Sequence, residues 1–220
     1  MISHKYRCIF IHIPKTAGTS IEKCLGHFTS FEPGVQDHRP LKVIEPLFFK
    51  EVIYHVQKRN RSIRSKYKVL RSYFNPPVTH EQYRTYFKFT FIRNPWSRVY
   101  SWYKDVMRWE PHQKSLGIKP ECTFEEFILD HTDQWALRPQ LYWMKNRQGQ
   151  LDFDFIGRFE NLTQDFAYII DKLGLAERKL PELLVSGNSL YTDFYNEKLI
   201  KVIAERYDEE IKLFKFEFGQ

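Results

Sequence analysis

The sequence predicts an α/β protein, in which a parallel β-sheet carries helices on both faces. Three short apolar segments, residues 6–13, 86–92 and 152–157, have the composition of buried strands. Each is followed by a loop and then by residues with helical spacing, the pattern of parallel strands joined by crossover helices. Since 42% of the 220 residues are hydrophobic, the chain can form one well-packed core, and we expect a single domain over residues 1–220.

The first strand–loop–helix unit lies at the start of the chain. Residues 6–13 are an apolar and β-branched run that ends at Pro14. Residues 19–28 have apolar side chains at helical spacing, and we expect Thr19 or Ser20 to cap this helix.

Loops and helices alternate over the next hundred residues. Two prolines and a glycine predict a loop over residues 29–40, whereas residues 41–71 have a mainly helical pattern, which NPP at 75–77 interrupts. After the second strand, residues 96–109 have helical spacing and residues 110–121 are expected to form a loop.

The rest of the chain adds the third strand and three helices. A helix over residues 123–131 begins with a capping box, TFEE. The helix after the third strand covers residues 161–173 and stops at Gly174. A last amphipathic helix is expected over residues 193–214.

The cysteines and the hydropathy pattern exclude several protein classes. Cys8, Cys24 and Cys122 are odd in number and include no CxxC pair, so neither a disulfide framework nor a zinc ribbon is expected. We expect Cys8 and Cys24 to be buried free thiols in a reducing compartment. No apolar run approaches the roughly 20 residues of a bilayer span and no export signal is visible, so we expect a cytoplasmic protein.

The net charge of +7 is concentrated in one segment. Residues 42–71 contain nine Lys and Arg residues and two Glu, which equals the net charge of the whole chain, and the densest part is QKRNRSIRSKYK at 57–68. Such a segment is either a solvated helix face or a surface for an anionic partner, such as an acidic glycan, a nucleic acid or a lipid headgroup.

The loop after the first strand has the composition of an anion-binding site. In FIHIPKTAGTS (residues 10–20) a strand leads into small, polar residues and then a helix, a P-loop-like arrangement whose backbone N–H groups can converge on a phosphate. The GxxxxGK[ST] pattern of nucleoside triphosphatases is absent. A Gly/Thr/Ser turn without a ligand is the alternative. The expected phosphate-binding residues are Lys15, Thr16, Ala17, Gly18, Thr19 and Ser20.

A second basic loop follows the second strand. In RNPWSRVYSWY (residues 93–103), Arg93 stands at the strand end and Ser101 lies on the following helix, which brings its hydroxyl back toward that end. The two side chains can therefore hold a second phosphate. The alternative to phosphate binding is that the arginine pairs with a nearby carboxylate, which is more plausible for Arg98 than for Arg93. Both loops lie beyond the carboxyl ends of strands, where parallel sheets bind ligands.

The two loops carry a family resemblance. HIPKTAGTS and FIRNPWSRVYSWY resemble the two signatures of the sulfotransferases that use 3′-phosphoadenosine 5′-phosphosulfate (PAPS), in particular the carbohydrate branch called sulfotransferase family 2. FDFIGRFENLTQDF (153–166) and residues 188–218 are similar to later blocks of this family. The resemblance covers nearly the whole chain, and residues 42–85 match least.

The resemblance implies an activity and a cofactor. PAPS would be the sulfuryl donor, with its 5′-phosphosulfate in the first loop and its 3′-phosphate at Arg93 and Ser101. Lys15 would reach the leaving oxygen while an acceptor hydroxyl attacks sulfur in line. The product would be adenosine 3′,5′-bisphosphate, and no metal is expected because there is no β,γ-phosphate pair to bridge.

A histidine is expected to deprotonate the acceptor hydroxyl. His38 in QDHRPL is the candidate, because it lies after the first helix and related enzymes carry a base histidine in the segment after the phosphosulfate loop. Asp37 would orient its ring or serve as a turn residue. His12, on the first strand, is expected to be a packed structural side chain. The reserve candidates for the base are Glu22, His27 and His80.

Other residues are assigned to the acceptor and the adenine. Gln140 and Tyr142 would line the acceptor site or pack in the core, and by resemblance Ile156, Gly157 and Phe159 border the adenine. We expect a hydroxyl-bearing saccharide as acceptor, anionic if the basic segment takes part, and neither a nucleic acid partner nor a membrane span. The acceptor's identity and the oligomeric state stay open, and a Golgi location is the alternative if the chain is part of a longer protein.

Two rival interpretations remain. A Mg²⁺-dependent nucleotide kinase or nucleoside triphosphatase would need the absent GK[ST] sequence. A non-enzymatic module that binds an acidic glycan or nucleic acid would depend on residues 57–71 and not on Lys15.

Overall fold

A four-stranded sheet forms the centre of the protein. The computed structural model describes residues 1–30, 32, 34–58, 60, 62–175 and 190–220. The strands lie in the spatial order β1 (Ile2–Ser3), β2 (Cys8–Ile11), β3 (Phe87–Ile92) and β4 (Phe155–Arg158). β2, β3 and β4 are parallel, with Phe10 opposite Phe89 and Phe89 opposite Phe155, which confirms the predicted α/β class.

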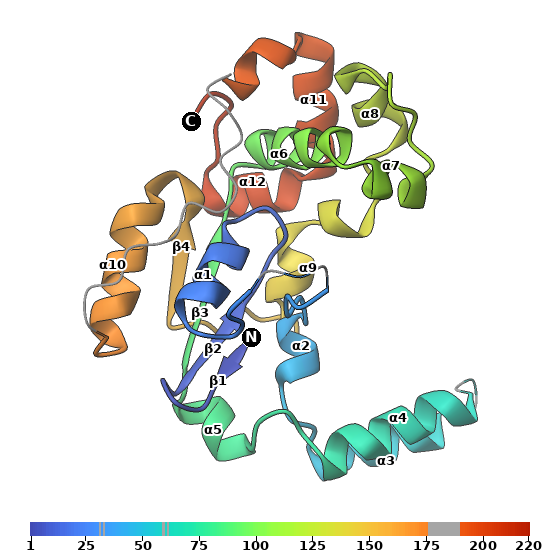
Figure 1. The fold of residues 1–220 in the computed structure, drawn as a ribbon. Helices are drawn as coiled ribbons and strands as arrows, with labels where there is room; N and C mark the ends of the chain where they lie inside the picture. Colours follow the sequence, from blue (N-terminus) through green and yellow to red (C-terminus); the bar gives the residue numbers. More distant parts are fainter. Residues whose placement is uncertain (31, 33, 59, 61, 176–189) are drawn as a thin grey trace.

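Helices account for most of the remaining described chain (Figure 1). The α-helices are α1 (Gly18–Cys24), α2 (Leu41–Ile44), α3 (Phe49–Gln57), α4 (Ile63–Phe74), α5 (His80–Thr85), α6 (Pro95–Arg108), α7 (Glu110–Leu116), α8 (Phe124–Asp130), α9 (Gln140–Met144), α10 (Leu162–Lys172), α11 (Glu197–Arg206) and α12 (Asp208–Phe214). The 3-10 helices are η1 (Trp135–Leu137), η2 (Phe159–Asn161) and η3 (Tyr191–Phe194).

The alternation of side chains along the strands creates two separate cores. Phe10 stacks on Phe89 at a ring distance of 5.0 Å, and this face is covered by α1 and α10. Ile9 and Ile11 point to the other face, where apolar side chains of α2, α6, α9 and α11 meet them. The prediction of helices on both faces is confirmed, since neighbouring residues of a strand point to opposite faces.

The edges of the sheet differ from the prediction. β1 pairs antiparallel with β2, so the sheet is mixed and not wholly parallel. A strand of two residues has too short a pattern to be seen in sequence. The third predicted strand begins at Phe155 and not at residue 152, because the side chain of Asp154 accepts a hydrogen bond from the backbone N–H of Lys88 at 2.7 Å.

One loop prediction and one helix prediction were wrong. The expected loop at 110–121 contains α7, because Pro111 sits in the first turn, where its missing N–H costs nothing, and left-handed Gly117 ends the helix. The expected helix over 193–214 is divided into η3, α11 and α12. The break between α11 and α12 lies at Tyr207, whose buried hydroxyl donates to the carbonyl of Leu137 at 2.7 Å.

Local signals at other positions were reliable. Thr123 and Glu126 form the predicted capping box of α8. Gly174 has a φ of 61° just after α10, the left-handed conformation that ends helices. The three cysteines are free, as predicted; Cys8 is buried, whereas Cys24, which was also expected to be buried, is only partly buried.

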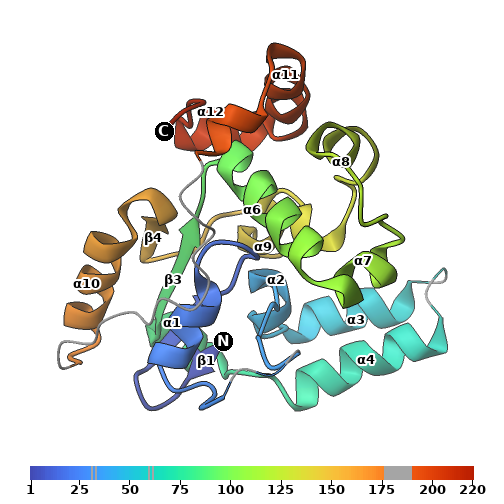
Figure 2. The same cartoon turned by 45° about the horizontal axis from the view of Figure 1, so that its top comes forward.

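α3 and α4 form a helical hairpin that extends from the rest of the molecule (Figures 1 and 2). Together with α2 they confirm the mainly helical prediction for residues 41–71, and the NPP sequence follows the end of α4 at Phe74. Neither these nor the other helices of the described residues combine the length and the apolar composition that crossing a membrane requires.

We predict that Gly157→Ala destabilises the sheet. Gly157 of β4 lies opposite Phe91 of β3, and a Cβ atom here would lie 2.5 Å from Cε1 of the Phe91 ring. Because the ring is fully buried, it can yield only by repacking the core. The free energy of unfolding, measured with urea, should fall by about 1–3 kcal/mol.

A double-variant cycle isolates this contact. Phe91→Leu removes the ring atoms, so the penalty of Gly157→Ala should be smaller in the Phe91→Leu background than in the wild type. Equal penalties in the two backgrounds would contradict the predicted overlap.

Candidate functional site

The loop between β2 and α1 has an unusual backbone. Lys15 and Ala17 have φ values of 69° and 65°, in the left-handed region that non-glycine residues seldom adopt. The hydroxyl of Thr16 donates to the carbonyl of Ile13 at 2.9 Å and tightens the turn. α1 begins directly after Ala17, at Gly18, so the expected capping by Thr19 or Ser20 is wrong and both residues lie inside the first turn.

Gly18 is required because His12 lies against it. A Cβ atom on Gly18 would overlap the imidazole of His12. His12 is buried, its Nδ1 lies 3.2 Å from Oε1 of Glu22, and burial lowers its pKa to about 3. These contacts agree with the prediction of a packed structural histidine.

Two arginines of the β3–α6 unit hold this loop. Nη1 of Arg93 donates to the carbonyl of Lys15 at 3.1 Å, and Nε of Arg98 donates to the carbonyl of Pro14, also at 3.1 Å. The two basic loops predicted from sequence therefore meet at the carboxyl ends of β2 and β3. Neighbouring parallel strands bring such ends together.

Arg98 is buried, and its guanidinium binds backbone carbonyls and not a carboxylate of the described residues. Its Nη2 donates to the carbonyls of Ala136 and Arg138, at 2.6 and 3.0 Å. Its side chain is fully buried, and burial lowers its pKa. Among the described residues no carboxylate pairs with Arg98, so the expected alternative of an ion pair is not supported. Nη1 of Arg98 has no hydrogen-bond partner within the described part of the chain.

Arg93 is buried but retains a free donor. Its Nε donates to Oγ of Ser97 at 2.9 Å, and its guanidinium carbon lies 3.8 Å from the centre of the Phe159 ring. Among the described residues, no side chain or carbonyl accepts from Nη2. Burial lowers the pKa of Arg93 to about 10, so the side chain is cationic at neutral pH.

One row of α6 connects the two basic residues. Ser97, Ser101 and Asp105 follow at intervals of four residues, so they lie along one side of the helix. Ser97 contacts Arg93, and Oδ2 of Asp105 lies 3.3 Å from Nζ of Lys15. Burial lowers the pKa of Lys15, and Asp105 opposes this effect by stabilising the ammonium.

His38 lies beside the same loop. Its Nδ1 is 3.0 Å from the carbonyl of His12, and since a carbonyl only accepts, Nδ1 carries the proton and Nε2 keeps a lone pair. The rings of Trp135 and Trp143 lie 5.1 and 6.3 Å from its ring. Burial, helped by His12, lowers the pKa of His38 to about 4.

Of the other candidate residues, the structure places some in the site and others outside it. Glu22 lies in the site, against His12, whereas His80 lies at the base of the hairpin, 3.2 Å from the carbonyl of Leu47. Gln140 is fully buried, and its amide exchanges two 2.8 Å hydrogen bonds with the backbone of Arg93. Gln140 therefore holds the end of β3, which is the packing alternative.

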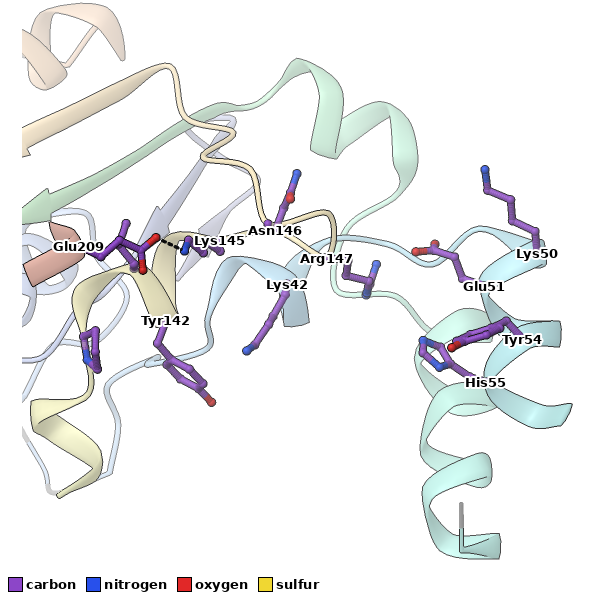
Figure 3. A pocket seen from close by; sticks show the side chains of 13 residues that line it. Lys42, Lys50, Glu51, Tyr54, His55, Tyr142, Lys145, Asn146, Arg147 and Glu209 are labelled. Carbon is purple, nitrogen blue, oxygen red and sulfur yellow. Dashed lines mark hydrogen bonds and ion pairs between the residues drawn. The ribbon is translucent and has the colours of Figure 1, made fainter. Parts of the chain in front are cut away.

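A basic groove of about 1040 Å³ opens between α3 and α9 (Figure 3). On the α9 side the ring of Tyr142 faces it, with Lys42 Nζ at 4.1 Å and the Arg138 guanidinium carbon at 4.6 Å from the ring centre. Lys145 also lines the groove and pairs with Glu209 at 2.5 Å. One lysine and one arginine thus lie against the same aromatic ring.

α9 links this groove to His38. Tyr142 lines the groove, and the next residue, Trp143, is fully buried and contacts the ring of His38. The rings of Tyr142 and Trp143 are perpendicular to each other at 5.1 Å. The rings of Tyr142 and Trp143 therefore connect the groove to the imidazole, which does not itself line the groove.

Several residues of the site were not found in sequence. The four-residue spacing from Ser101 could have indicated Ser97 and Asp105, since it places all three on one helix side. Trp135 and Trp143, which surround His38, have no such signal. Their contact with a loop about 100 residues earlier exists only in the folded chain.

The fold and the site define a class of protein. A strand–loop–helix unit with Lys15 in its turn, braced by arginines from the next parallel strand, makes this an α/β protein of the phosphate-loop type. A model of the sulfotransferase family matches residues 1–217. The chain belongs to the sulfotransferase family.

Its similarity to individual proteins is distant. Carbohydrate sulfotransferase 10 of Xenopus laevis is 23% identical over 98% of this chain and 66% of the relative. Carbohydrate sulfotransferase 14 of Danio rerio is 25% identical over 64% of this chain and 47% of the relative. An uncharacterized protein of Archaeoglobus fulgidus is 34% identical over 52% of this chain and 86% of that protein. The chain thus spans from about half to two thirds of the named carbohydrate sulfotransferases, and no solved structure is significantly similar to it.

We predict that Asp105→Asn makes activity more sensitive to alkaline pH. Loss of the carboxylate removes a charge that stabilises the Lys15 ammonium, so the lowered pKa of Lys15 falls further. The ratio of kcat/KM between variant and wild type should fall about threefold or more as pH rises from 6 to 9.

Glu110→Gln provides the matched control. Glu110 lies on the next helix and forms an exposed pair with Lys114 at 2.6 Å, so its loss should leave the ratio constant with pH. A constant ratio for Asp105→Asn as well would contradict the role of Asp105.

Proposed function

We propose that this protein transfers the sulfuryl group of PAPS to a hydroxyl of a carbohydrate and releases adenosine 3′,5′-bisphosphate. The observation that carries the proposal is the hydrogen bond that the Arg93 guanidinium donates to the backbone carbonyl of Lys15, which brings two cationic residues together across neighbouring strand ends. PAPS has two separate anionic groups, a 5′-phosphosulfate and a 3′-phosphate. A lysine and an arginine held at a fixed separation suit such a ligand.

The donor would lie along the α6 row. In this proposal the loop from Lys15 to Ser20 binds the 5′-phosphosulfate, and Arg93 with Ser101 binds the 3′-phosphate. Nη2 of Arg93, which is without a protein partner among the described residues, is the donor available for this contact. Lys15 would leave Asp105 and follow the more strongly charged phosphosulfate.

Transfer would be an in-line displacement at sulfur. The acceptor oxygen forms a bond to sulfur while the bond from sulfur to the bridging phosphate oxygen breaks, and Lys15 stabilises the charge that develops on that oxygen. The acceptor proton would go to Nε2 of His38. Nε2 can accept the proton because its lone pair is free and because the lowered pKa of His38, about 4, keeps the imidazole unprotonated at neutral pH. The same lowering makes His38 a weaker base than a histidine whose pKa lies near neutrality.

A saccharide acceptor is supported by two observations. Relatives with 23% and 25% identity are carbohydrate sulfotransferases. The groove is lined by Tyr142, whose ring has the cations of Lys42 and Arg138 against it, and an aromatic ring with nearby cations suits a sugar that carries acidic groups. The proposal therefore places part of the acceptor in this groove.

We predict that the protein distinguishes nucleotides by their 3′-phosphate. Adenosine 3′,5′-bisphosphate should raise the melting temperature more than adenosine 5′-monophosphate does, because Arg93 contacts the additional phosphate. Arg93→Ala should abolish the difference between the two nucleotides. Lys15→Ala should retain it but lower kcat by about 100-fold or more, since the lysine acts on the leaving oxygen.

Arg64→Ala on the exposed helix α4 is the control and should behave as the wild type does. Stabilisation by ATP with Mg²⁺ alone would contradict the proposal and favour a nucleotide kinase. Loss of ligand binding on removal of the basic residues 57–71, with Lys15 dispensable, would favour a non-enzymatic binding module.

We predict that activity persists in acid to an unusual degree. A base with a pKa of about 4 loses its function only below that pH, so kcat/KM should stay constant down to about pH 5 instead of falling near pH 6.5. His38→Asn should lower kcat by about 100-fold or more at every pH in this range.

The matched control is His80→Asn, an exposed histidine at the base of the hairpin, which should leave the pH profile unchanged. Circular dichroism at each pH separates loss of activity from unfolding. An acidic limb near pH 6.5 that survives in His38→Asn would assign the base to another residue.

A further inference from the structure

The hairpin formed by α3 and α4 exposes an unusual amount of apolar surface. Eight of the sixteen described large apolar side chains that are exposed lie between residues 48 and 74. None of the twelve side chains of α4 is buried, and in α3 only Val52 is. An exposed group of this size marks a contact surface in a protein of ordinary composition.

On α4 the exposed apolar residues form one stripe. Ile63, Tyr67, Leu70 and Phe74 follow at spacings of four, three and four residues, so they lie on one side of the helix. Their exposed fractions are 88%, 64%, 37% and 72%. We call these four residues the α4 stripe. It is separate from the less exposed side of α4, which includes Val69.

Cations flank the α4 stripe. At 100° per residue, Arg64 and Arg71 follow it on one side and Lys66 lies on the other, while Lys68 is farther round on the polar face. Among the described residues, no carboxylate forms an ion pair with any of these four side chains. The charges are therefore available to an external anionic surface.

The segment also holds the net charge of the protein. Residues 48–74 contain eight Lys and Arg residues and one Glu, a net charge of +7, which equals that of the whole chain. The remaining residues are balanced in charge. A second copy of the chain would bring two such segments together, and their repulsion disfavours pairing of the stripes.

We propose that the α3–α4 hairpin docks on the surface of an anionic lipid bilayer. An apolar stripe flanked by Lys and Arg is the pattern of a helix that lies in the membrane interface, with its apolar side chains among the acyl chains and its cations at the headgroups. Tyr67, with its polar hydroxyl, suits the headgroup level. The hairpin extends away from the sheet, and α4 lies at the edge of the molecule (Figures 1 and 2).

Docking would place the basic groove beside the membrane. α3 forms one wall of that groove, through Lys50, Glu51 and Tyr54 (Figure 3). The docking itself rests only on the hairpin and does not depend on the proposed sulfotransfer.

The test is sedimentation with vesicles. The wild type should bind vesicles of phosphatidylcholine with about 30% phosphatidylserine at least tenfold more tightly than pure phosphatidylcholine vesicles, and binding should weaken with salt. The variant Ile63→Gln/Phe74→Gln should bind the anionic vesicles about tenfold or more weakly. Arg64→Gln/Arg71→Gln should lose the preference for phosphatidylserine.

Leu213→Gln, which replaces an exposed leucine of α12, is the matched control and should bind as the wild type does. All the substituted side chains of α4 are exposed, so melting temperatures near the wild-type value should accompany these results. Absence of binding to anionic vesicles would overturn the proposal. Vesicle binding that needs the arginines but not Ile63 and Phe74 would also overturn it and would indicate a soluble polyanion as the partner. A dimer that Ile63→Gln/Phe74→Gln dissociates, and that the other variants leave intact, would overturn it as well.

Discussion

Two buried guanidinium groups hold the loop between β2 and α1, and the candidate site depends on them. Arg98 and Arg93 donate to the carbonyls of Pro14 and Lys15, and both come from the β3–α6 unit. A loop with left-handed residues at Lys15 and Ala17 needs such support, because neither residue favours that backbone by itself. Burial of Arg98 is unfavourable for a charge, and three hydrogen bonds to carbonyls offset part of that cost. The site is thus a property of two neighbouring strand ends and not of one loop.

Burial also adjusts the ionisable groups around this loop. Burial lowers the pKa of Lys15 and Asp105 opposes this effect, so Asp105 is an acidic partner that a more highly charged ligand can replace. The pKa of His38 is lowered to about 4, and its Nδ1 is held by a carbonyl, which leaves a neutral ring with a free Nε2. A cation and a neutral imidazole are the two groups that sulfuryl transfer to a hydroxyl would require, and the chain's membership of the sulfotransferase family is consistent with both.

The net positive charge of the protein lies in the α3–α4 hairpin and not in the loop between β2 and α1. The net charge lies in the hairpin, whereas the rest of the chain is balanced. Within the hairpin, α3 contributes to the basic groove and α4 exposes its apolar stripe, so one element carries two surfaces of different chemistry.

Four features could be predicted from the sequence alone: the three parallel strands, the helices after them, the free cysteines and the two basic loops. These features are local, because strand and helix periodicity and loop composition are encoded within about ten residues. Only the tertiary structure decided that Arg98 braces carbonyls, that Asp105 holds Lys15, that Tyr207 divides the last helix, and that tryptophans surround His38. Each of these depends on contacts between residues far apart in the chain, and no pattern within one segment specifies which distant group burial will bring against it.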